Sequence, residues 1–378
     1  MKKVLILANT AWSILNFQEG LLRSLIDRGF KVVVVAPYDD SVSKLNGIGC
    51  SFLAISLDRK GTNPLRDLTL LYRIYSILKT ERPDILITRT VKPNIYGSLA
   101  ARILKIPVIN VITGLGTPFI RRGWLQTVVS LLHKISLRWS RKVFFLNRDD
   151  YELFLKLGLV NPKVTDLLPS DGINLERFKP GVFERDTDGR FRFLFIGRLL
   201  WDKGVGEFVE AAKHLKGRYQ DVEFFLLGFL DPQNPSGISR DDLDRWVSEG
   251  YVTYLGSSED VRPYITSADC VVLPSSYREG IPRALLEAAA MEKPIITTNS
   301  VGCKEVVDDG VNGFLVRPRD AIDLAKKMEA MIKLPEDERV LMGRRGREKV
   351  MREFDERIVI EKWLETLKSV GWMCEARR

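Results

Sequence analysis

The chain has 378 residues, 45% of them hydrophobic and 28% charged, and its formal net charge is +9. A single hydrophobic core stops growing near ~250–300 residues, so this length predicts two globular domains. Four cysteines without a CxxC pair and two histidines argue against a disulfide scaffold or a structural zinc site, and we interpret the cysteines as those of a cytoplasmic protein. No run reaches the roughly 18–20 apolar residues that span a bilayer, and no signal-peptide pattern begins the sequence.

Short apolar runs alternate with helical patterns through the first half of the chain. Strands are predicted at residues 4–8, 32–36, 85–88, 108–112 and 143–146. Helices are predicted at residues 17–28, 65–79, 94–104 and 125–139. Nearly continuous runs of Val, Ile and Leu indicate strands that are covered on both faces, and therefore a parallel sheet.

A long basic segment lies within this half, because residues 85–148 contain no Asp or Glu at all. A field of one sign attracts an anionic partner, which could be nucleic acid, an anionic membrane surface or a phosphorylated acceptor. A basic surface without a partner is the alternative. No helix-turn-helix, zinc-finger or RNP-like pattern is present, so we expect no nucleic acid partner.

The second half repeats the alternation, with strands predicted at residues 191–196, 222–227, 252–255, 270–273 and 294–298. The polar segment 179–190 contains Pro180, Gly181 and Gly189 and is interpreted as a linker. We therefore expect an α/β fold of two doubly wound, Rossmann-like domains, over residues 1–178 and 179–352, followed by a terminal segment over 353–378. Ligands of such sheets bind at the carboxyl ends of the strands, so the site is expected in a cleft between the two domains.

The most informative segment is residues 274–298, which begins Pro-Ser-Ser-Tyr-Arg-Glu-Gly-Ile-Pro. Pro282 suits the first turn of a helix, so Glu279 would lie at the helix amino terminus and Glu287 inside the helix. Backbone N–H groups at such a terminus can bind an anion, and the carboxylates can accept hydrogen bonds from sugar and ribose hydroxyls. Taken alone, two glutamates at this spacing would more often form a solvated face.

A second segment, residues 195–204, places two cations where a strand turns into a helix. Arg198 and Lys203 follow the strand that ends at Ile196, and a helix is predicted from Val205 to Lys216. Two cations at such a turn can hold a diphosphate. Two unrelated surface charges are the alternative interpretation.

These motifs, together with residues 305–316, resemble the retaining family 4 glycosyltransferases of the GT-B fold, and the resemblance covers nearly the whole chain. It implies that Arg198 and Lys203 hold the diphosphate of a nucleotide-sugar donor. It implies that Glu279 contacts the donor sugar, and that Glu287 binds the nucleotide ribose. The remaining donor contacts implied are backbone groups of Gly280, Ile281 and Pro282. A last helix near residues 358–368 is implied to cross back to the first domain.

A narrower resemblance is to N-acetylgalactosaminyltransferases of the PglA type, which extend a polyprenyl-diphosphate-linked sugar in bacterial glycan assembly. It rests on residues 171–175, 198–208, 231–236 and 274–282, and in the first half on residues 9–17, 92–94 and 113–116. It implies a UDP-sugar donor, with N-acetylgalactosamine favoured, and a lipid-diphosphate-linked sugar acceptor. The residues expected on the acceptor or membrane side are Asn9, Lys92, Gly114, Arg121, Arg122 and Trp124.

An apolar stripe at helical spacing supports the membrane part of this hypothesis. Tryptophan among cations is typical of a membrane interface, although the same helix could simply pack on the sheet. The stripe comprises Trp124, Val128, Leu131, Ile135 and Trp139, with Arg and Lys between them.

Several other features limit the chemistry. Many family members place a histidine after the strand that ends here at Ile112, but this chain has Thr113-Gly114, so that route is absent. His133 and His214 are interpreted as structural, His133 alternatively as membrane-facing. The first strand is followed by Asn9-Thr-Ala-Trp rather than GxGxxG, so no dinucleotide cofactor is expected. The D-x-D pattern at residues 186–188 lies in the linker and is interpreted as chance, and no metal is expected.

The sequence therefore predicts a retaining glycosyltransferase that moves a hexose or N-acetylhexosamine from a UDP-sugar to a polyprenyl-diphosphate-linked sugar. Arg198 and Lys203 would stabilise the charge on the leaving diphosphate, so neither a metal nor a cofactor is needed. We expect peripheral association with the inner face of the cell membrane. The alternatives are a family 4 enzyme with a soluble acceptor, a sugar-nucleotide epimerase or hydrolase on the same fold, and a non-enzymatic anion- or membrane-binding protein.

Overall fold

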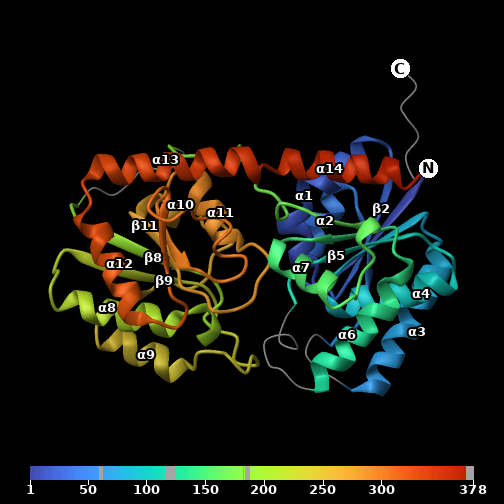
Figure 1. Ribbon diagram of the computed structural model, residues 1–378, viewed down its shortest axis with the longest axis horizontal. Coiled ribbons are helices and arrows are strands. Elements are labelled where there is room, and N and C mark those ends of the chain that lie inside the picture. Colours follow the sequence, from blue (N-terminus) through green and yellow to red (C-terminus); the bar gives the residue numbers. More distant parts are fainter. Residues whose placement is uncertain (59–62, 116–123, 182, 184–187, 372–378) are drawn as a thin grey trace. The chain divides into compact units, whose positions relative to one another are not determined.

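The computed structural model describes residues 1–58, 63–115, 124–181, 183 and 188–371. The chain folds as two compact units, an N-terminal unit of Met1–Gly172 with Glu356–Arg378, and a C-terminal unit of Ile173–Asp355. Each unit contains one parallel sheet with helices on both of its faces (Figure 1). The predicted α/β class, with two doubly wound sheets, is confirmed.

The sheet of the N-terminal unit has the strand order β3-β2-β1-β4-β5-β6-β7, and every described pair is parallel. The order reverses between β1 and β4, where Leu7 lies opposite Thr88. In open α/β sheets, ligands bind at the carboxyl ends of the strands beside such a reversal. The strands are β1 (Lys3–Leu7), β2 (Lys31–Ala36), β3 (Ser51–Ala54), β4 (Ile85–Arg89), β5 (Val108–Ile112), β6 (Lys142–Phe145) and β7 (Thr165–Leu167).

Helices cover the two faces of this sheet because the strands are apolar on both sides. One face packs against α1 (Ala11–Asp27), α2 (Ser41–Ile48) and the last helix, α14 (Glu356–Ser369). The other face packs against α3 (Pro64–Glu81) and α4 (Ser98–Ile103), which Figure 1 shows beside α6 (Trp124–Ser136). Trp363 of α14 is fully buried, with its ring centroid 5.2 Å from that of Phe144. The last helix is therefore part of the core of the N-terminal unit.

The first helix begins earlier than its apolar pattern predicts. α1 starts at Ala11 rather than at residue 17, because the Thr10 side chain accepts a hydrogen bond from the Ser13 backbone N–H at 3.1 Å. Residues 11–16, which precede the predicted helix, therefore form the first turns of α1.

The sheet of the C-terminal unit has the order β10-β9-β8-β11-β12-β13, again with every described pair parallel. Its strands are β8 (Phe191–Ile196), β9 (Val222–Leu227), β10 (Thr253–Tyr254), β11 (Cys270–Leu273), β12 (Ile295–Thr298) and β13 (Gly313–Val316). Its helices are α8 (Val205–Lys216), α9 (Arg240–Ser248), α10 (Arg262–Ser267), α11 (Arg283–Ala290), α12 (Ala321–Lys333) and α13 (Glu336–Glu353). Here the order reverses between β8 and β11, so the loops that follow these two strands border the expected ligand position.

None of the helices in the described ranges combines the length and the apolar character needed to cross a membrane.

Candidate active site

The loops that follow β8 and β11 are held together at the reversal of the C-terminal sheet. The Asp202 carbonyl, after β8, accepts hydrogen bonds from the backbone N–H groups of Ser276 (2.9 Å) and Tyr277 (3.0 Å), after β11. Gly204 has a φ of 81°, and a Cβ there would lie 2.2 Å from the Pro274 carbonyl oxygen. Only glycine therefore allows the start of α8 to approach the second loop this closely.

This packing brings two of the predicted site residues into direct contact. Lys203 Nζ lies 2.5 Å from Glu279 Oε2, and the Ser275 hydroxyl donates to Glu279 Oε1 at 2.8 Å. The Lys203 and Glu279 side chains are only 12% and 13% exposed. The result is a nearly buried cation beside a carboxylate with a fixed position, which is suited to binding a polar, anionic ligand.

A third loop, which follows β12, packs closely against the backbone of Glu279 and Gly280. Gly302 has a φ of 85°, and a Cβ at this position would lie 1.6 Å from the Gly280 carbonyl oxygen. Cys303 is buried next to it, and burial and the charge of Glu279 raise its thiol pKa to about 12. Cys303 therefore stays protonated near neutral pH and acts as a packing residue.

Arg198 lies at the same edge of the sheet but is more exposed. Its side chain is 41% exposed, and its guanidinium lies 3.6 Å from Asp231, a residue of the loop after β9. The sequence analysis missed a third cation, Arg319, whose Nε donates to the Ser276 hydroxyl at 3.3 Å. Arg319 also lies 3.8 Å from Asp202. No spacing rule in the sequence links Arg319 to these loops, because it follows β13, a strand that was not predicted.

Glu287 projects from α11, which begins at Arg283 after Pro282 as its amino-terminal cap residue. Its Oε1 accepts a hydrogen bond from Arg283 Nε at 3.0 Å. Burial raises the pKa of the Glu287 carboxyl, and the neighbouring Arg283 partly opposes that shift. Gly280 and Ile281 lie between Glu279 and this cap residue. The first backbone N–H groups of α11, which have no partner within the helix, are therefore only a few residues from Glu279 along the chain. The seven residues of the predicted donor site thus lie on two connected loops and one helix.

The residues expected on the acceptor side follow strands of the N-terminal sheet. Asn9 comes after β1, Lys92 after β4, and Gly114, with a φ of 132°, after β5. Lys92 Nζ pairs with Asp67 at 2.6 Å. Arg121 and Arg122 lie outside the described residues, and of Trp124 only its place as the first residue of α6 is described.

The apolar stripe on α6 is largely exposed. Val128, Leu131 and Ile135 are solvent-exposed, and so is Trp139 just beyond the helix, where Arg102 lies 4.9 Å from its ring. The opposite side of α6 is buried through His133, so the helix both packs on the unit and exposes apolar residues. The sequence analysis missed a neighbouring exposed set on α3 and α4, which also borders a cavity of about 570 Å³. This set comprises Leu65, Leu68, Tyr72 and Ile103.

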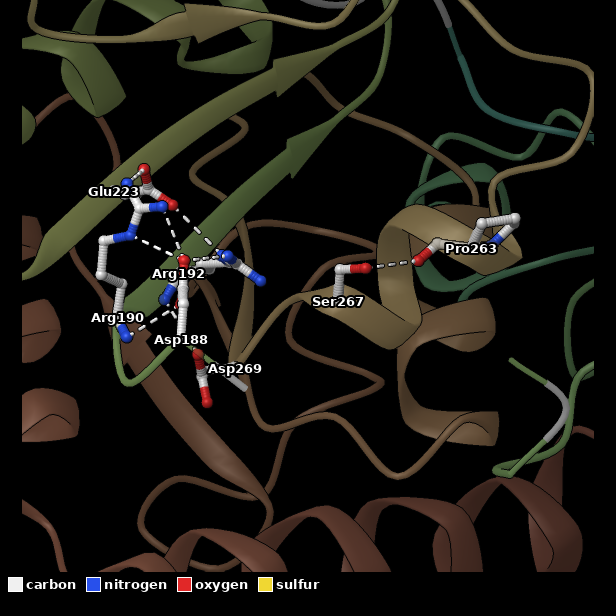
Figure 2. A network of polar contacts seen from close by, with 7 residues as sticks. All are labelled: Asp188, Arg190, Arg192, Glu223, Pro263, Ser267 and Asp269. Carbon is white, nitrogen blue, oxygen red and sulfur yellow. Dashed lines mark hydrogen bonds and ion pairs between the residues drawn. The ribbon is translucent and has the colours of Figure 1, made fainter. Parts of the chain in front are cut away.

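Of the D-x-D pattern, Asp186 and Thr187 lie outside the described residues, and Asp188 forms ion pairs with neighbouring arginines (Figure 2). Asp188 Oδ2 accepts hydrogen bonds from Arg190 and Arg192, each at 2.7 Å, and Arg192 also donates to Glu223. Asp188 is therefore engaged by two arginines at the amino end of β8, opposite the Lys203 edge. Arg192 also lines a cavity of about 420 Å³, together with Leu194, Phe225 and residues of α10. Among the described residues, no group of three or more His, Cys, Asp or Glu could hold a metal ion.

Comparison with known proteins gives matches in both halves of the chain. Residues 3–147 match the family model described as glycosyl transferase 4-like, and residues 190–333 match the one described as glycosyl transferases group 1. The chain is 30% identical to the N,N'-diacetylbacillosaminyl-diphospho-undecaprenol alpha-1,3-N-acetylgalactosaminyltransferase of Campylobacter jejuni, over 95% of this chain and 96% of that protein. It is 26% identical to the UDP-Gal:alpha-D-GlcNAc-diphosphoundecaprenol alpha-1,3-galactosyltransferase of Escherichia coli, over 77% and 76% of the two chains.

Solved structures agree on the fold. The chain superposes with a TM-score of 0.80 on a glycosyltransferase from Rickettsia africae, at 19% identity and with 98% and 99% of the chains covered. It superposes with a TM-score of 0.79 on Anabaena Alr3699/HepE in complex with UDP, at 19% identity and with 98% and 100% covered. The predicted GT-B fold is confirmed.

Proposed function

Because this chain belongs to the group 1, family 4-like glycosyltransferases, we propose that it transfers a sugar from a UDP-sugar to a polyprenyl-diphosphate-linked sugar in bacterial glycan assembly. N-acetylgalactosamine is the favoured donor sugar, because the relative with 30% identity over nearly the whole chain is named for its transfer. The observation that carries the proposal is the Lys203–Glu279 contact at the reversal of the C-terminal sheet. Nucleotide ligands of open α/β sheets bind at this position.

In this proposal Lys203 and Arg198 hold the diphosphate of the donor. The donor phosphates take over from Glu279 as the partner of Lys203, and the exposed Arg198 side chain approaches them from the adjacent loop. As the bond from the sugar to the diphosphate breaks, negative charge grows on the leaving oxygen. Cations already held in place stabilise that charge without reorganising, which lowers the barrier.

Glu279 and Glu287 bind the hydroxyl groups of the donor. Glu279, freed from Lys203, accepts hydrogen bonds from the transferred sugar, with Ser275 fixing its second oxygen. Glu287 accepts hydrogen bonds from the ribose, and Arg283 helps keep its carboxyl ionised. The backbone of Gly280, Ile281 and Pro282 contacts the sugar and the phosphates at the start of α11. The family is retaining, so we propose front-side attack by the acceptor hydroxyl, with the anomeric configuration kept.

The acceptor is proposed to bind the N-terminal unit, near the carboxyl ends of its strands at Asn9, Lys92 and Gly114. The exposed apolar residues of α3, α4 and α6 support peripheral attachment to the inner face of the cell membrane. They lie within or beside the segment 85–148, which has no acidic residue, so the surface suits anionic lipids. Arg121, Arg122 and Trp124 belong to the same proposed membrane side.

Incubation with a panel of UDP-sugars, with and without a polyprenyl-diphosphate-linked sugar, tests the proposal. We expect UDP release and a lipid-linked disaccharide from one donor, and only when the acceptor is present. Turnover without an acceptor would instead indicate an epimerase or a hydrolase. Binding of UDP without transfer to the lipid-linked sugar, but with transfer to a free sugar, would move the acceptor class to soluble compounds.

A further inference from the structure

A buried polar network joins β4, β5 and the helical turns between them. The Thr88 hydroxyl donates to Asn94 Oδ1 at 2.6 Å, and Asn110 Nδ2 donates to the Thr88 and Ser98 hydroxyls at 2.7 and 2.8 Å. The Ser140 hydroxyl donates to Asn110 Oδ1 at 2.5 Å. These buried groups satisfy one another, as polar groups inside proteins normally do.

Arg89 and Thr90, which follow Thr88 along the chain, differ from these groups because each has a buried polar atom without a described partner. Arg89 is buried, and its Nη2 donates to both carboxylate oxygens of Asp171, at 2.6 and 2.8 Å. Its other terminal nitrogen, Nη1, is buried and has no hydrogen-bond partner in the described part of the chain. The hydroxyl of Thr90 is also buried, and within the same residues it too lacks a partner. Buried donors of this kind lower stability unless something else supplies an acceptor.

The backbone around this ion pair is strained as well. Thr90 has a φ of 71°, in the left-handed region that β-branched residues rarely adopt. Ser170, adjacent to Asp171, has a φ of 65°. Residues held in such conformations concentrate at functional sites, where the strain persists because it places a group for binding.

Both residues lie at the reversal of the N-terminal sheet. Arg89 is the last residue of β4, and β4 pairs with β1 at this reversal. Gln18 of α1 donates to Asp171 at 2.7 Å, so the carboxylate that orients the guanidinium is itself held in place. The feature therefore combines unpaired donors, strain and the expected ligand position in one place.

We propose that Arg89 and Thr90 form a subsite for a phosphate oxygen of the acceptor's diphosphate, an inference that rests on the proposed lipid-diphosphate acceptor. A guanidinium presents planar donors that match phosphate oxygens, and because Asp171 engages only Nη2 of Arg89, Nη1 is left for a phosphate oxygen. The predicted cation of this loop, Lys92, already pairs with Asp67. The two donors are shielded from solvent, so a bound oxygen does not compete there with bulk water.

The replacement Thr90→Gly separates this role from a structural one. Glycine relieves the positive φ and removes the unpaired hydroxyl, so the melting temperature is expected to stay unchanged or rise. The KM for the lipid-linked acceptor is expected to rise about tenfold, as for the loss of one hydrogen bond to a charged group. The KM for the UDP-sugar is expected not to change. Arg82→Gly is the matched control, because Arg82 also has a positive φ but is exposed at the end of α3.

Farnesyl diphosphate, which lacks a sugar, serves as the competitor that reports on the diphosphate. We expect it to inhibit the wild type, and to inhibit Thr90→Gly and Arg89→Lys about tenfold less strongly. Equal inhibition of the wild type and Thr90→Gly, or a lower melting temperature of Thr90→Gly, would overturn the assignment of Thr90. A wild type that farnesyl diphosphate does not inhibit would contradict the proposed acceptor class instead.

Discussion

Lys203 Nζ lies 2.5 Å from Glu279 Oε2, although 76 residues separate the two along the chain. Each side chain is nearly buried, and each belongs to a loop at the reversal of the C-terminal sheet. A structural ion pair and a catalytic one differ in what their loss does to turnover and to stability.

Replacing Lys203 or Glu279 with alanine is expected to lower turnover far more than stability. Loss of a group that stabilises the transition-state charge costs roughly 10²–10³-fold in kcat. The measurement is kcat and KM for the donor alongside the melting temperature. The control is Lys213→Ala, which breaks a pair with Glu210 on the outer face of α8 and is expected to leave both quantities unchanged. Activity near wild type in either active-site variant would remove the assigned role.

Glu287→Gln tests the proposed ribose contact with little change in shape. Burial raises the pKa of this carboxyl, so the folded state favours its protonated form. The stability gained from the protonated form is present at low pH and is lost as pH rises through the raised pKa. The amide removes this effect, so stability near neutral pH should be unchanged or higher. UDP affinity, measured by calorimetry, is expected to fall about tenfold, because a carboxylate accepts hydrogen bonds more strongly than an amide oxygen. Undiminished UDP affinity would place the ribose elsewhere.

The burial of His133 predicts that the protein loses stability in acid. Burial lowers its pKa to about 4 from 6.5, so the folded protein keeps it neutral where the unfolded chain takes up a proton. The stability that depends on neutral His133 is present above pH 6.5 and is lost as pH falls towards 4, by up to about 3 kcal/mol. His133→Phe retains the ring contact with Phe154 and should flatten the stability curve in this window. The exposed His214, changed to Gln, should leave the curve as it is.

The exposed apolar residues of α3 predict a measurable membrane contribution. Changing Leu68 and Tyr72 together to serine is expected to reduce sedimentation with vesicles that contain phosphatidylglycerol, because both apolar side chains insert at the interface. Transfer to a short-chain acceptor in detergent should stay the same. Ile322→Ser, at an exposed position of α12 in the C-terminal unit, is the control. Unchanged vesicle binding together with a dimer that dissociates in the variant would identify this face as a subunit contact.

The sequence predicts the central strands and the donor loops well because their signals are local. β8 and α8 begin and end at the predicted residues, and Gly204 marks the turn between Lys203 and the helix. The edge strands β3, β7 and β13 were missed, since each has only three or four residues, too few to show a strand pattern. Arg319 was missed with β13, and the strain at Thr90 has no sequence signature, because nothing in the local pattern predicts a positive φ there.

The most direct measurement is the fate of the sugar from UDP-N-acetylgalactosamine, labelled in the sugar ring, after incubation with a polyprenyl-diphosphate-linked acceptor and a chelator. The label is expected in the organic-solvent extract as an α-linked, lipid-linked disaccharide, and Lys203→Ala should abolish it. The chelator should have no effect, because Arg198 and Lys203 supply the positive charge at the diphosphate. Label that remains in the aqueous phase, with every UDP-sugar tried and despite measurable UDP binding, would contradict the lipid-linked acceptor.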